Sequence, residues 1–120
     1  MTAPYLVALA TSDGKIINQH FGRCPAWTIV ELGGGEPRFV ERRETDAPCG
    51  EGGHSDGGLD AAITLLSDCR AVLAARIGPG AGARLKARGL DAFEIGSYVD
   101  DALSQLDDYY SNPREASRVG

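Results

Sequence analysis

The chain has 120 residues, of which 42% are hydrophobic and 24% charged, and this composition predicts one soluble globular domain with a single core. Its formal net charge of −5 argues against nucleic acid as a partner, because phosphate binding requires a clustered basic face. No apolar run approaches the ~20 residues of a membrane span, and no signal peptide is recognisable, so we expect a cytoplasmic protein without membrane contacts. Three cysteines are an odd number, which excludes a complete disulfide framework and leaves packing, redox chemistry or metal ligation as their roles.

The first half of the chain predicts strands. The apolar run Tyr5–Thr11 is typical of a strand buried on both faces, and Ser12–Gly14 closes it with a turn. The β-forming residues Trp27–Leu32 predict a second strand. A glycine-rich hairpin then leads to Pro37–Glu44, whose polar composition predicts a strand at an edge of the sheet.

The second half of the chain alternates between helical and extended patterns. Apolar residues between Leu59 and Leu66 recur at helical spacing and predict a helix. Ser55 or Asp56 would cap its start. The elements expected after it are, in order, a strand at Ala71–Ala75, a helix at Ala81–Arg88, a strand at Leu90–Ile95 and an amphipathic helix at Val99–Tyr109. Residues 111–120 lack an apolar cluster, which predicts a disordered tail after one domain spanning residues 1–110.

This order of elements predicts the α/β class, with a single domain built on a mixed five-stranded sheet flanked by helices. Crossovers between parallel strands should be right-handed. Ligands in such folds usually bind beyond the carboxyl ends of the parallel strands. We therefore expect the functional loops to lie together on that rim of the sheet.

A stretch of ten residues, 49–58, combines Cys49 and His54 with five glycines. Cys and His bind soft and borderline metals, and glycine lets the backbone approach a bound object closely. A second pair, His20 and Cys24, lies in the irregular loop between the first two strands, where a short connection would expose the thiol. These four residues are the candidate metal ligands. The alternatives left open are an ordinary surface loop, a histidine that only bonds its neighbours, and a Cys24 buried as a small hydrophobe.

The spacing of these ligands does not match a closed structural zinc site. The chain has no Cys-x-x-Cys motif, which argues against a structural zinc site and against thioredoxin-like redox chemistry. A preassembled cluster needs only a few protein ligands, and backbone N–H groups stabilise its charge. The residues suited to binding such a group, besides the four ligands, are Gly22, Arg23, Gly50, Gly52 and Gly53. Arg76 would add positive charge, although a surface arginine also pairs readily with a carboxylate.

Two further features have structural interpretations. Cys69 lies between a predicted helix and an apolar strand, so we expect it to pack in the core. Gly78–Gly80 precedes a helix whose N-terminus would recognise an anion. It lacks the Lys-Ser/Thr ending of a phosphate-binding loop, so a nucleotide site is not indicated.

Several of these motifs occur in a recognisable order. Ser12–Gly14 is followed by His20–Cys24 and the strand at Trp27, and the Cys49 loop is followed by Leu65–Leu73 and Arg76–Gly80. This combination resembles the dinitrogenase iron–molybdenum cofactor biosynthesis family, which includes the NifX carrier proteins and the C-terminal domain of NifB. The resemblance covers about residues 3–109, nearly the whole chain.

The resemblance implies a ribonuclease H-like fold and a carrier role rather than an enzymatic one. By this resemblance the cargo would be an iron–sulfur cluster, the iron–molybdenum cofactor or its precursor, bound transiently during nitrogen fixation. The implied partners are the proteins that donate and accept the cluster. The chain contains no radical-enzyme domain, so the chemistry of cluster assembly is not expected here.

Two other functions remain open from the residues alone. The same four ligands would serve a mononuclear metal site or a redox sensor. A ribonuclease H-like nuclease would need carboxylates clustered around two metal ions, and the spacing of Asp13, Asp56, Asp60 and Asp68 shows no such motif. The sequence also leaves open whether the protein forms a homodimer.

Overall fold

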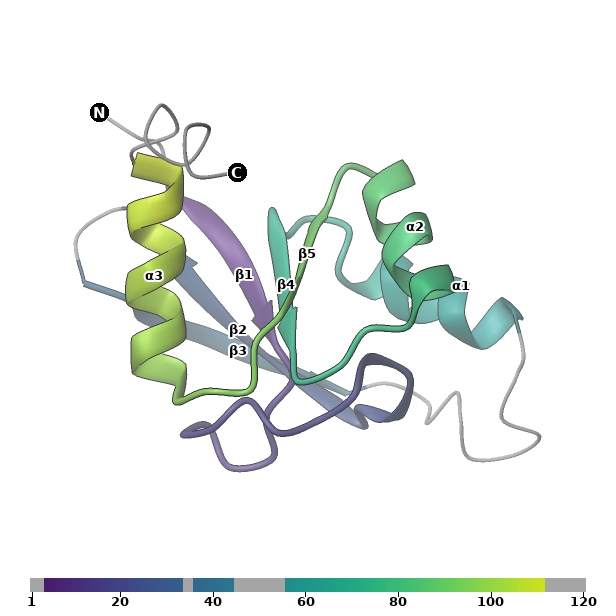
Figure 1. Ribbon diagram of the computed structural model, residues 1–120, viewed down its shortest axis with the longest axis horizontal. Helices are drawn as coiled ribbons and strands as arrows, with labels where there is room; N and C mark the ends of the chain where they lie inside the picture. Colours follow the sequence, from purple (N-terminus) through teal and green to yellow (C-terminus); the bar gives the residue numbers. More distant parts are fainter. Residues whose placement is uncertain (1–3, 34–35, 45–55, 112–120) are drawn as a thin grey trace.

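Five strands form one mixed sheet at the centre of the computed structural model, which describes residues 4–33, 36–44 and 56–111 (Figure 1). The strands are β1 (Tyr5–Leu9), β2 (Ala26–Leu32), β3 (Arg38–Glu44), β4 (Ala71–Ala74) and β5 (Asp91–Glu94), arranged in the order β3-β2-β1-β4-β5. β1 pairs in parallel with β4, and β4 with β5, whereas β2 is antiparallel to both of its neighbours. The predicted single-domain α/β fold with a mixed five-stranded sheet is thereby confirmed. The ribonuclease H-like label stays a prediction.

The charged strand β3 lies at one edge of the sheet, as its composition predicted. Its pairing with β2 shifts register between Ile29 and Val30, so that Ile29 faces Glu41 while Val30 faces Phe39. One extra residue, Val40, therefore lies in β3 between these two pairs and forms a bulge. Charges and bulges at an edge discourage pairing with another chain.

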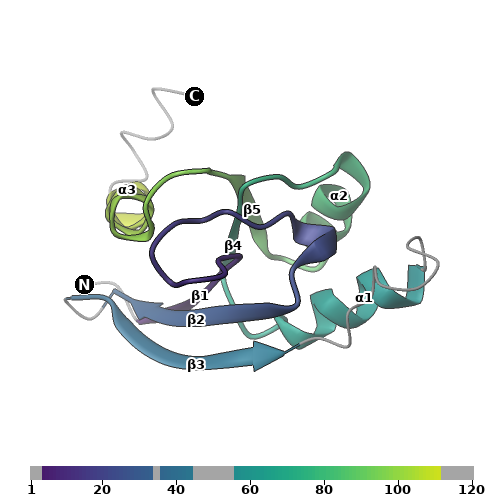
Figure 2. The same cartoon turned by 90° about the horizontal axis from the view of Figure 1, so that it is seen from below.

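Helices cover both faces of the sheet (Figures 1 and 2). The helices are α1 (Asp56–Leu65), α2 (Pro79–Ala87) and α3 (Val99–Ser111), and a short 3₁₀ helix spans Phe21–Arg23. α1 and α2 lie on one face and α3 on the other. Within the described residues, no helix is both long and apolar enough to cross a membrane.

Three predicted element boundaries need correction. Helix α1 already begins at Asp56, so the last part of the stretch 49–58 is helical rather than part of the loop. Helix α2 begins at Pro79 rather than Ala81, because the fixed φ of proline suits the first helical position. Ser111 ends α3 and does not belong to a tail. The rest of the predicted tail, residues 112–120, lies outside the described residues.

The apolar side chains divide into two cores, one on each face of the sheet. On the α1 and α2 face, Ile63 and Leu85 pack against the fully buried Trp27 and its neighbours. Cys69 belongs to this core, which confirms its predicted packing role. On the α3 face, Leu103 anchors the helix against the sheet. Burial of such side chains contributes about 1.5–3 kcal/mol each, and this holds the strand ends in place.

Candidate functional site

The loop after β1 crosses the carboxyl ends of the parallel strands. His20 forms a parallel bridge with Arg76, just beyond β4, and the Phe21 amide donates to the Arg76 carbonyl at 2.9 Å. The Ala75 amide donates to the Gln19 carbonyl at 3.0 Å. The backbone around His20 is therefore fixed by neighbouring strands, while its imidazole is exposed. The first loop lies on the predicted rim, and it presents a histidine to solvent there.

Cys24 is buried, and the expectation of an exposed thiol at this position is wrong. The side chain is 2% exposed, and its Sγ donates to the Ala26 carbonyl at 2.9 Å. The chain enters β2 at Ala26, and Cys24 packs in the same core as Phe21 and Trp27. Burial raises the pKa of the Cys24 thiol to about 11, so the thiol is protonated at neutral pH. Its role as a metal ligand stays a prediction.

The second candidate pair, Cys49 and His54, lies outside the described residues, as do Gly50, Gly52 and Gly53. The residue before this segment is placed, because Glu44 at the end of β3 pairs with Ala26 at the start of β2. β2 is antiparallel to β1, so its start lies at the carboxyl end of β1. Strand β3 therefore ends, at Glu44, on the rim that carries His20.

Gly78–Gly80 forms the start of α2 on this rim. Gly78 is the N-cap residue, it makes no side-chain cap hydrogen bond, and the first turn carries no acidic residue. Arg76 is exposed beside this turn. The Ile77 amide just before the helix, however, donates to the Glu94 carboxylate at 2.8 Å. The helix N-terminus and Arg76 attract anions, whereas Glu94 already brings one negative charge to this end of the rim.

Within residues 4–33, 36–44 and 56–111, no group of three or more His, Cys, Asp or Glu side chains is arranged to hold a metal ion. Of the four candidate ligands, this part of the chain contains His20, exposed, and Cys24, buried. The described residues alone therefore do not supply a metal site at the rim.

Three of the four carboxylates considered for nuclease chemistry have separate partners, and the side chain of the fourth, Asp56, is not among those that the structure describes. Asp68 binds the Arg43 guanidinium through both oxygens, at 2.7 and 2.8 Å, and this pair holds the pKa of Asp68 below its usual range. Asp60 accepts from Arg84 at 2.9 Å. Asp13 accepts the backbone amide of Lys15 within its own turn. Nothing in these contacts favours a two-metal nuclease.

Sequence reasoning missed two residues near the rim. The indole N–H of Trp27 is buried and, within the described residues, has no hydrogen-bond acceptor, while its ring lies 5.3 Å from that of Phe21. Arg42 lies close enough to Cys24 for its charge to oppose the rise in the thiol pKa. The exposure of Arg42 was predictable, because arginine is mostly exposed and the edge strand was predicted, but its proximity to Cys24 depends on the pairing of β3 with β2.

Comparison with known protein families identifies the family of this chain. Residues 3–109 match the family described as dinitrogenase iron-molybdenum cofactor, which is most of the chain. The chain belongs to this family. The resemblance noted in its motifs is confirmed by this match.

Two relatives of known sequence extend beyond the segment that aligns with this chain. The chain is 36% identical over 118 residues to FeMo cofactor biosynthesis protein NifB of Frankia alni, covering 96% of this chain and 23% of that protein. An uncharacterized protein of Methanocaldococcus jannaschii is 32% identical over 94 residues, covering 78% of each chain. The chain thus spans about a quarter of the length of the NifB relative.

A solved structure has a fold similar to that of this chain. The crystal structure of a putative dinitrogenase from Methanocaldococcus jannaschii superposes with a TM-score of 0.57 at 13% identity, covering 89% of this chain and 91% of that one. At this identity the likeness concerns the fold alone. It supports the α/β arrangement that places the His20 loop on the carboxyl rim.

Proposed function

We propose that the protein binds a preassembled iron–sulfur metallocluster, the iron–molybdenum cofactor or a precursor of it, and hands it to an acceptor protein without catalysing a reaction. Membership of the family points to a role in the biosynthesis of this cofactor. The observation that carries the proposal is the exposed imidazole of His20 on a rim whose backbone is fixed by the neighbouring strand.

The chemistry of the rim suits temporary binding of a bulky anion. A neutral imidazole is a good ligand for iron, and the small residue Gly22 leaves room beside it. Arg23, Arg76 and the start of α2 would offset the negative charge of the cluster in a chain whose net charge is −5. Few protein ligands keep such a complex reversible, and transfer to an acceptor requires this reversibility.

The proposed ligands beside His20 are Cys49 and His54, with backbone N–H groups of Gly50, Gly52 and Gly53 facing the cluster sulfides. Cys24 would become a ligand only after its thiol left the Ala26 carbonyl and lost its proton. Burial opposes both steps, because it raises the pKa of the Cys24 thiol to about 11. We therefore rank His20 and Cys49 as the principal ligands. The proposed partners are the proteins that supply and receive the cluster.

Anaerobic titration with isolated iron–molybdenum cofactor tests the proposal directly. The parent protein should retain iron and molybdenum through gel filtration, and His20→Ala and Cys49→Ala should each retain much less. Lys15→Ala is the matched control, because Lys15 is exposed in the same loop and is not a proposed ligand. Equal retention by the parent and both ligand variants would rule out the proposed site.

Reconstitution with ferrous iron and sulfide separates the carrier from a mononuclear site. A carrier should retain iron and acid-labile sulfide in similar amounts. Iron without sulfide would instead indicate a mononuclear metal site or sensor built from the same ligands.

A further inference from the structure

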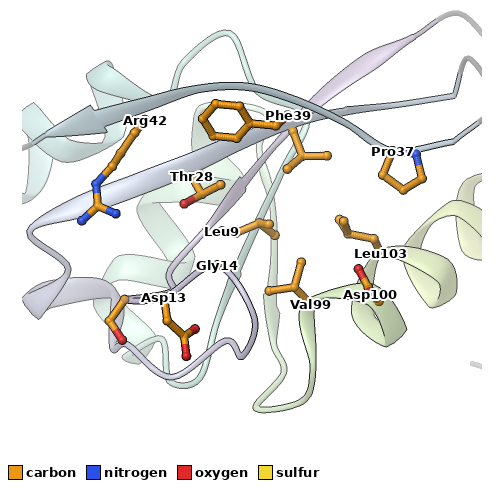
Figure 3. A pocket seen from close by; sticks show the side chains of 12 residues that line it. Leu9, Asp13, Gly14, Thr28, Pro37, Phe39, Arg42, Val99, Asp100 and Leu103 are labelled. Atoms are coloured by element: carbon orange, nitrogen blue, oxygen red, sulfur yellow. The ribbon is translucent and has the colours of Figure 1, made fainter.

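A groove of about 430 Å³ lies on the α3 face of the sheet, between the start of α3 and strands β2 and β3 (Figure 3). The turn Ser12–Gly14 closes one end of it. The His20–Cys24 segment packs in the core on the opposite face through Phe21 and Cys24, so the groove and this segment lie on different faces of the sheet. A volume of this size lies within the range of pockets that bind small organic molecules.

The floor of the groove consists of two rows of side chains that run across the strands. In one row Leu9, Thr28 and Arg42 are paired neighbours, and in the next row Val30 is paired with Phe39. The bulge in β3 brings Phe39 and Arg42, three residues apart, to the same face. The Phe39 ring and the Arg42 side chain thus line the same floor, and Figure 3 shows the guanidinium directed away from the ring, on the side where Thr28 lies.

Phe39 is poorly covered for a residue in this position. Its side chain is 63% exposed, although Val30 beside it is 6% exposed. Helix α3 contributes Val99 and Leu103 to the far wall and leaves the β3 side of the floor open. Exposed aromatic surface on a concave apolar floor is the usual character of a ligand site.

Arg42 differs from the other two arginines of β3. Arg38 forms an ion pair with Glu31 at 3.1 Å, and Arg43 pairs with Asp68 at 2.7 Å. Among the described residues, Arg42 has no ion-pair partner, and it is the arginine that lines the groove. A guanidinium beside apolar surface selects a carboxylate or a similar anion.

The opposite wall limits how much negative charge the groove accepts. Asp13 and Asp100 line it, and the carboxylate of Asp13 is held in its turn by the amides of Lys15 and Ile16 at 2.8 and 3.2 Å. A second anionic group on the ligand would approach these carboxylates. Repulsion between like charges disfavours such a ligand.

We propose that this groove binds a small organic monocarboxylate, with its aromatic or apolar body on Val30 and Phe39 and its carboxylate paired with Arg42. The hydroxyl of Thr28, next to Arg42 on the floor, is placed to donate to the same carboxylate. This site is additional to the proposed cluster site, and neither depends on the other.

Three probes with the same ring system test the ligand class on the full chain. Naphthylacetate carries one negative charge, its amide carries none, and a naphthalene dicarboxylate carries two. Calorimetry should show that naphthylacetate binds about tenfold more tightly than the other two, because only it gains a charge-assisted pair without repulsion. Amide chemical shifts should change at Thr28, Phe39 and Leu103. Equal affinity for the neutral amide, absence of binding, or shifts confined to another surface would overturn the proposal.

Variants on β3 test the role of the guanidinium. Arg42→Gln should weaken naphthylacetate binding about tenfold and remove its advantage over the neutral amide. Arg38→Gln is the matched control on the same strand and should bind like the parent. Phe39→Ser should weaken the binding of all three probes. Because Phe39 is exposed, this substitution should leave the core unchanged. Similar losses in Arg38→Gln and Arg42→Gln would contradict the assignment, provided that thermal melts show both variants folded.

Discussion

The two ends of the parallel strands use their side chains differently. At the amino end, the guanidinium of Arg70 lies 3.7 Å from the ring centre of Tyr110 and 5.2 Å from that of Tyr5. The hydroxyl of Tyr110 donates to Asp91, and that of Tyr5 donates to Asp107. These polar groups satisfy one another and fasten the end of α3 to the sheet.

At the carboxyl rim, the contacts that fix the chain are mainly those of the backbone. Hydrogen bonds donated by the backbone amides of Phe21 and Ala75 fix the loop. The imidazole of His20 is exposed and takes no part in these bonds. Side chains at the amino end therefore stabilise the fold, whereas the rim leaves a side chain available for binding. This contrast predicts where substitutions should affect stability and where they should affect binding.

Tyr110→Ala should have the largest effect on stability. It removes the ring that contacts Arg70 and Tyr5 and leaves the Asp91 carboxylate without its donor. We expect a loss of about 2–3 kcal/mol in the free energy of unfolding, measured by urea denaturation. Tyr98→Ala serves as control, since Tyr98 is 62% exposed. A comparable loss in both variants would contradict the structural role of the amino end.

The buried thiol of Cys24 should make stability fall at high pH. Burial raises its pKa in the folded state to about 11, above the ~8.5 of an unfolded thiol. The folded state therefore favours the neutral thiol, and this stabilisation is complete below about pH 8 and is lost as pH rises toward 11. Urea unfolding should show that the parent loses up to about 2 kcal/mol more than Cys24→Ala between neutral pH and pH ~10.5. Parallel pH profiles for the two proteins would contradict this prediction.

Tyr110→Phe should have a smaller effect, because only the hydroxyl is removed. The lost hydrogen bond to Asp91 is expected to cost about 1 kcal/mol. Tyr109→Phe is the matched control one residue earlier, where the ring contacts Phe93 and Tyr110 and is 47% exposed. An equal change in the two variants would mean that the Asp91 hydrogen bond adds no stability.

The strands and the core were predictable because their signals are local. The continuous apolar run from Tyr5 indicates a strand with both faces buried, and the charges of β3 indicate an edge strand. Neither indication depends on the rest of the fold. The packing of Cys69 followed in the same way from its apolar neighbours. The burial of Cys24 did not, since it depends on β2 beginning at Ala26 and on the core that forms around Phe21.

The groove was not predictable for a related reason. Strict alternation along β3 would place Phe39 with Glu41 and Arg43 on one face. The bulge changes this register, so that Phe39 shares a face with Arg42, while Arg43 reaches the opposite face and binds Asp68. The sequence of β3 contains no glycine or proline that marks the bulge, and only pairing with β2 reveals it. The family resemblance, in contrast, depends on motifs and was readable directly.

His20→Ala should change stability least and cluster binding most. It therefore tests most directly whether side chains at the carboxyl rim serve binding while those at the amino end serve stability. The imidazole is exposed and no backbone contact depends on it, so the free energy of unfolding should change by no more than about 0.5 kcal/mol. Cluster affinity should nevertheless fall in His20→Ala and in Cys49→Ala if both residues bind the same cluster. The double variant should then lose less than the sum of the two single losses, because removing one ligand already disrupts the geometry in which the other works.

Anaerobic cluster titrations of the parent and all three variants measure cluster affinity, and thermal melts of the empty proteins measure stability. Additive losses would mean that His20 and Cys49 act at separate sites, and an early melt of His20→Ala would mean that the rim histidine supports the fold.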